Sequence, residues 1–145
     1  MPLISRLFLK SGLIFFVAAL ITGLGLQFQS ASIPVLFPLF WHMLMLGWIT
    51  QIIMGVSHWM FPGREREESF KNQRWVWIAF ICLNVGLLLR VIAEPFINTS
   101  SSLVWKVLLA ISAVAQFIAV LSYAIEIWPR VKGKKKRIST SKSDV

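Results

Sequence analysis

The sequence predicts an all-α protein, a four-helix transmembrane bundle, and three observations carry that prediction. The chain has 145 residues, of which 57% are hydrophobic and only 14% are charged. Soluble domains carry roughly 25% charged residues, so this composition is typical of an integral membrane protein. The apolar residues fall into four segments, and helices are favoured over strands because backbone groups in lipid must be paired within their own segment.

The four apolar segments are separated by short polar breaks and run over about 7–27, 34–61, 75–92 and 103–128. At about 1.5 Å per residue, each is long enough as a helix to cross a hydrocarbon layer of about 30 Å. Pro129 is expected to stop the fourth helix. We therefore expect one four-span domain over 1–129, followed by a basic cytoplasmic tail over 130–145 that is disordered.

Lys and Arg are distributed unevenly between the polar breaks. The 28–38 and 93–103 breaks hold none, the 62–74 break holds four, and seven of the fifteen lie from Arg130 to Lys142. Cytoplasmic loops of membrane proteins carry the excess of Lys and Arg. We therefore expect a multi-pass protein of the inner (plasma) membrane with both termini in the cytoplasm. The net charge of +9 is therefore expected to contact the lipid bilayer and not nucleic acid.

The first apolar segment has an alternative interpretation. A basic start, an apolar run over 13–26 and the small residues Ser30-Ala31-Ser32 also fit a cleaved signal peptide. We favour a retained helix, because cleavage would remove the expected packing partner of the fourth segment and nothing downstream resembles a soluble secreted domain.

Only two histidines occur, and both lie in the second apolar segment, His42 near its start and His58 near its end. An ionisable side chain inside a membrane span indicates a functional site by default. On a single α-helix the two side chains would lie about 24 Å and about 160° apart, so they cannot bind one ion. With a single cysteine, Cys82, a site of three or four ligands is not expected. One axial bond to a heme iron stays open.

The stretch from Pro38 to Pro62 resembles the second transmembrane helix of subunit I in heme–copper oxidases, closest to the nitric-oxide reductase branch. It is more similar still to small four-helix membrane proteins described as oxidase subunit I-like. The residues that carry this resemblance are His42, Leu46, Gly47, Trp48, Gly55, Phe61 and Pro62, together with the 84–95 segment. They cover less than half of the chain.

In the large oxidase subunits the matching histidine binds a low-spin b-type heme near the outer membrane face. The resemblance therefore implies that His42 is the metal ligand of a heme b, and the distribution of Lys and Arg places His42 near the same face. The large subunits have further helices that supply a second heme ligand and a copper cluster, and this chain has neither. A complete oxidase or reductase is therefore not expected from this chain alone, and whether it is an enzyme stays open.

Arg90 and Glu94 are four residues apart in the third segment, near its outer end. A guanidinium at the depth of His42 can bind a heme propionate through two hydrogen bonds. An i,i+4 ion pair or a snorkelling arginine is the simpler interpretation. We name His42 and Arg90 as the candidate cofactor-binding residues.

A heme iron bound by His42 either takes a second protein ligand or keeps one coordination position open. The second ligand is expected from another copy of the chain across a two-fold axis, where Gly47 would allow close approach, or from a partner membrane subunit. A five-coordinate heme with an open face is the third option.

Two functions are compatible with these observations. The first is an integral membrane heme-binding protein related to heme–copper oxidase subunit I, acting in electron transfer or in the oxygen or nitric-oxide response. The second is a cofactor-free accessory or assembly subunit of a respiratory membrane complex. The mid-span amides Gln51 and Asn84 are expected to form hydrogen bonds between helices in either case.

Overall fold

The computed structural model describes residues 1–28, 36–61, 73–97 and 103–131, and over these ranges it is helical with no strand. Its elements in chain order are α1 (Leu3–Phe28), α2 (Leu36–His42), the π-helix η1 (Met43–Thr50), α3 (Gln51–Met60), α4 (Gln73–Ala93), the 3-10 turn η2 (Glu94–Phe96) and α5 (Leu103–Val131). Because α2, η1 and α3 follow one another without a break, they form the second span. Within the described ranges, four segments are long and apolar enough to cross a membrane, which confirms the predicted fold class.

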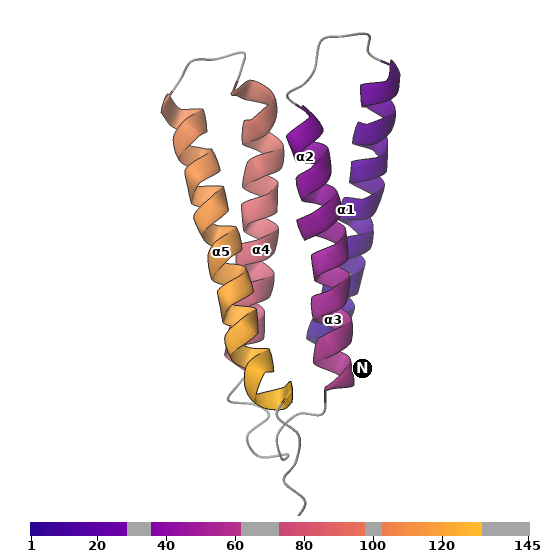
Figure 1. Cartoon of the computed structure of the whole chain (residues 1–145), viewed down its shortest axis with the longest axis vertical. Coiled ribbons are helices and arrows are strands. Elements are labelled where there is room, and N and C mark those ends of the chain that lie inside the picture. The colour runs from indigo at the N-terminus through magenta and orange to yellow at the C-terminus, as the bar shows by residue number, and fades with distance from the viewer. Residues whose placement is uncertain (29–35, 62–72, 98–102, 132–145) are drawn as a thin grey trace, which may run out of the picture.

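The helices stand side by side as two pairs, with α1 beside the second span and α4 beside α5 (Figure 1). The expectation that the first and fourth spans are packing partners is therefore wrong, because α5 packs mainly on α4. We call the end where α2 begins and α4 ends the outer end, following the orientation predicted from Lys and Arg. The end where α3 and α5 finish is the inner end.

Glycines set the closest approach within each pair. A Cβ atom on Gly47 would lie 2.7 Å from the Cβ of Phe15 in α1. A Cβ on Gly86 in α4 would lie 3.1 Å from the carbonyl oxygen of Ser112 in α5, whose hydroxyl donates to the Gly86 carbonyl at 2.6 Å. Small residues at such contacts let transmembrane helices pack backbone to backbone. Within the chain, Gly47 thus serves the contact with α1, and a two-fold contact with another copy stays a prediction.

Polar side chains join three helices in the middle of the bundle. Gln51 is fully buried, receives a hydrogen bond from the hydroxyl of Ser11 in α1, and donates to Asn84 Oδ1 in α4 at 3.2 Å. The predicted interhelical bonding of Gln51 and Asn84 is confirmed.

Gln51→Leu is expected to lower the free energy of unfolding by about 0.6–1.7 kcal/mol, from the average to the largest value for hydrogen bonds between transmembrane helices. The measurement is unfolding by SDS in mixed micelles, followed by circular dichroism. Thr22→Val is the matched control, because among the described residues the Thr22 hydroxyl bonds only to the Ala18 carbonyl of its own helix. Equal stability of Gln51→Leu and the wild type would contradict the prediction.

The fourth span extends past the proline that was expected to end it. Helix α5 runs to Val131 with Pro129 inside its last turn, so the predicted stop at Pro129 is wrong. Membrane helices tolerate proline where other groups pair with the freed backbone or hold the turn in place. Here Arg130 forms an ion pair with Glu126 across that turn. Arg130 thus belongs to the bundle, and the rest of the predicted tail, 132–145, lies outside the described residues.

Candidate functional site

Three charged or titratable side chains meet at the outer end, and we call His42, Arg90 and Glu94 the outer cluster. Arg90 Nη1 lies 3.0 Å from His42 Nε2 and donates to Glu94 Oε1 at 3.2 Å. Glu94 Oε1 also lies 3.7 Å from His42 Nδ1. The sequence placed His42 and Arg90 at one depth, and the structure brings the two side chains into direct contact.

The local fold determines which nitrogen of His42 carries the proton. His42 Nδ1 lies 2.7 Å from the carbonyl oxygen of Pro38, one turn earlier in α2, and a carbonyl only accepts. Nδ1 is therefore the protonated nitrogen, and Nε2 accepts from Arg90. A neutral imidazole held through Nδ1–H by a carbonyl is the usual arrangement of a metal-binding histidine.

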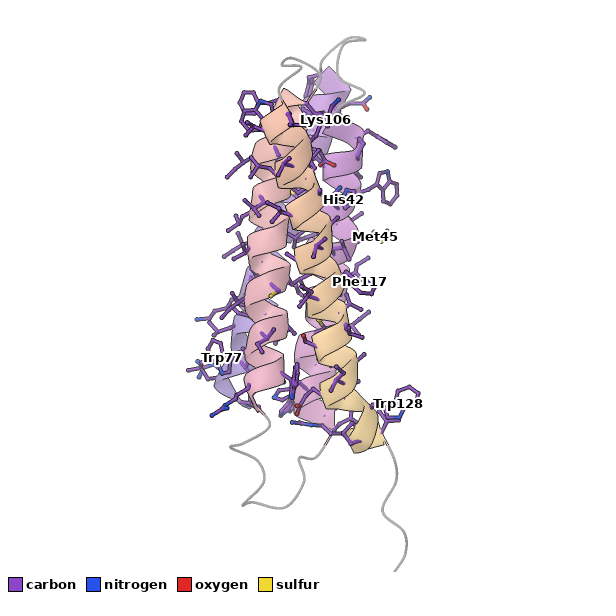
Figure 2. All side chains as sticks on the ribbon, turned by 90° about the vertical axis from the view of Figure 1, so that its left-hand side faces the viewer. His42, Met45, Trp77, Lys106, Phe117 and Trp128 are labelled. Carbon is purple, nitrogen blue, oxygen red and sulfur yellow. The ribbon has the colours of Figure 1, made fainter. Side chains whose placement is uncertain are left out.

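The outer cluster is partly buried and partly unpaired. The side chain of His42 is 30% exposed, against 14% for Arg90 and 8% for Glu94. Within the described ranges, Arg90 Nε and Glu94 Oε2 are buried and make no hydrogen bond. Buried polar atoms without partners are costly, and such atoms in a native protein call for water, an ion or a ligand. In Figure 2, His42 lies in the upper part of the bundle, below Lys106 and well above Trp128.

A second group of the same composition lies at the inner end, and we call His58, Glu126 and Arg130 the inner cluster. Arg130 pairs with Glu126 Oε1 and contacts His58 Nδ1 at 3.4 Å. Glu126 is 1% exposed and His58 is 5% exposed. Tyr123 lies beside this cluster, where its hydroxyl contacts Ser57 and donates to the Met54 carbonyl at 3.2 Å.

The π-helix η1 explains why both histidines of the second span face the α4–α5 pair. Its backbone bonds run from i to i+5, so each residue turns the helix by less than in an α-helix. Thr50 follows this spacing, since its hydroxyl donates to the Met45 carbonyl, five residues earlier, at 2.8 Å. The predicted offset of about 160° assumed an unbroken α-helix, and with η1 present it does not hold. His42 contacts α4 and His58 contacts α5.

Sequence reasoning missed the inner cluster and left Glu94 out of the site. The signal was present, because Glu126 and Arg130 have the same four-residue spacing as Arg90 and Glu94. Arg130 had been assigned to the tail because a proline precedes it. In the part of the chain that the structure describes, no three His, Cys, Asp or Glu side chains gather to hold a metal ion. A metal at the outer cluster would thus depend on the His42 imidazole.

The fold and these clusters define a class: a multi-pass membrane protein of four apolar helices, with a His–Arg–Glu group at each end of its second and most polar span. The family model described as NnrS protein matches residues 6–134. The chain therefore belongs to the NnrS protein family. No curated protein and no solved structure matches the chain.

Proposed function

We propose that the chain is a heme b-binding membrane protein of the nitric-oxide response, with His42 as the axial ligand and Arg90 as the partner of a propionate. The observation that carries this proposal is the His42 imidazole, whose Nδ1–H is fixed on the Pro38 carbonyl and whose Nε2 holds the lone pair. The family supports it, since NnrS is a heme- or metal-binding membrane protein involved in the response to nitric oxide. The proposed relation to heme–copper oxidase subunit I rests on the sequence resemblance alone.

The residues of the outer cluster fit such a cofactor. His42 Nε2 would hold the iron of a bound heme through the lone pair that accepts from Arg90, and the Arg90 guanidinium would then be available for a propionate carboxylate. Arg90 Nε, buried and unpaired, is the donor that a second oxygen of that carboxylate would use. Glu94 stays within reach of Arg90 and keeps the guanidinium at this depth. Bound heme would supply an iron that binds nitric oxide.

Among the described residues, no second histidine lies near His42. His58 lies at the far end of the second span, where it contacts Arg130. A second ligand would come from another copy of the chain or from a partner membrane subunit, and an iron without one keeps an open face for nitric oxide.

The experiment is the absorption spectrum of the full chain purified in detergent after expression with sufficient heme. A Soret band whose intensity corresponds to stoichiometric heme supports the proposal, and a colourless protein that also fails to bind added heme overturns it.

A cofactor-free accessory or assembly subunit of a respiratory complex is the second candidate, and one observation favours it. Arg90 Nη1 lies 3.0 Å from His42 Nε2, so these two side chains already connect α2 and α4 without any ligand. In that case His42 and Arg90 would act only in holding the two helix pairs together. The Soret measurement separates the two candidates.

We further infer that both termini lie in the cytoplasm, so that the outer cluster faces away from it. A reporter active only in the cytoplasm is expected to work when fused after Val145 and to fail when inserted within 98–102, because the Lys and Arg excess lies at the inner end. Cytoplasmic activity of the 98–102 fusion would contradict this orientation.

A further inference from the structure

The inner cluster has no part in the proposed heme site, yet it contains the most deeply buried charged pair among the described residues. Glu126 is 1% exposed, and its side chain lies in the last part of a membrane-spanning helix. A buried ion pair contributes little to stability compared with apolar side chains of similar volume. Ionisable groups inside a span are kept mainly where they move ions, protons or ligands. The cluster therefore needs a role beyond packing.

Only half of the Glu126 carboxylate is paired. Arg130 Nη2 donates to Oε1, whereas Oε2 is buried and has no hydrogen-bond partner among the described residues. A carboxylate oxygen that has left water without gaining a donor is unfavourable. A proton on Oε2 removes that charge, while Oε1 remains an acceptor for Arg130.

The partners of Glu126 lie at the inner end of the bundle, where the side chain of Arg130 is partly exposed. Arg130 lies in the last turn of α5 with 11% of its side chain exposed, and His58 Nε2 makes no hydrogen bond within the described ranges. Tyr123 is the other titratable neighbour. The remaining described charges at this end are exposed and form no ion pair with the cluster: Arg6, Lys10 and Arg74.

We propose that the inner cluster is a proton-binding site, at which Glu126 Oε2 takes up a proton from water at the inner end and returns it there. The O–H bond forms on Oε2, the carboxylate becomes a carboxylic acid, and the net charge of the cluster changes from zero to plus one. Arg130 and His58 act as positioning residues that hold the carboxyl group in place. This proposal does not depend on heme.

The test is infrared spectroscopy of the heme-free full chain in lipid nanodiscs, titrated from acidic to alkaline pH. We expect a C=O stretching band of a carboxylic acid that disappears reversibly as the pH rises and is lost in Glu126→Gln. Glu94→Gln is the matched control, because Glu94 also has a buried, unpaired Oε2 but lies at the outer end, and it should keep the Glu126 band.

An identical pH-dependent spectrum in the wild type and in Glu126→Gln would overturn the proposal, as would a wild type with no such band. If Glu126→Gln loses its helical circular dichroism, Glu126→Asp takes its place. This variant keeps a titratable group, and its band must then shift in frequency; an unshifted band assigns the signal to another carboxyl group and overturns the proposal.

Discussion

His42→Ala is expected to remove the Soret band entirely, whereas His58→Ala is expected to keep it. The reason is geometric: His42 is the only histidine of the outer cluster, and its Nδ1 is held by the Pro38 carbonyl, so Nε2 is the nitrogen left for iron. The measurement is heme per chain in the purified protein, together with the Soret absorbance. Arg90→Gln should keep the axial bond and weaken heme retention, because one propionate loses its charged partner.

His58→Ala is the matched control for His42→Ala. Each histidine makes one contact with an arginine of the α4–α5 pair, so each substitution removes a similar structural contact. Circular dichroism must show the same helix content in both variants. Equal heme content in His42→Ala and the wild type would exclude His42 as the ligand, and loss of heme in both variants would point to a general packing defect.

Gly47→Ala is expected to destabilise the protein, although alanine is the better helix former. The new Cβ would lie 2.7 Å from Phe15 Cβ, an atom next to the backbone of α1 that cannot move without that helix. Overpacking of this kind costs about 1–3 kcal/mol. The gain in helix propensity is at most about 1 kcal/mol, so overpacking wins. The measurement is the midpoint of unfolding by SDS in mixed micelles.

Gly25→Ala is the matched control for Gly47→Ala. Gly25 lies in α1, and a Cβ there meets no atom within 4 Å. This variant should be neutral or slightly more stable, so the difference between the two variants measures the overlap with Phe15. Equal stability of the two would contradict the described contact between α1 and the second span.

The sequence predicted much of the outer cluster. The similar depth of His42 and Arg90 followed from the rise of a helix and from the distribution of Lys and Arg, and both can be read from the sequence. Their direct contact through Nε2 and Nη1 did not follow, because it requires that α2 and α4 be neighbours. The heme and the role of these residues in binding it remain predictions.

The inner cluster shows why spacing alone was insufficient. Proline discourages helix in water, so the sequence predicts a helix end at Pro129. That end would separate Glu126 from Arg130. In the bundle, the ion pair and the His58 contact hold the last turn of α5 together. The four-residue spacing of Glu126 and Arg130 is visible in the sequence, whereas their contact with His58 on another helix is not.

The apolar segments of the sequence were enough to predict four spans and their approximate bounds, because a hydrocarbon layer requires long apolar segments with internally paired backbones. Hydrogen bonds from Gln51 and Asn84 to other helices were also predictable, since unpaired amides are costly in lipid. The packing of α1 against the second span and of α4 against α5 became visible only in the folded chain. The tertiary structure also decided the π-helix at Met43–Thr50, because the phase of a helix and its neighbours depend on side-chain packing across helices, which composition and periodicity do not encode.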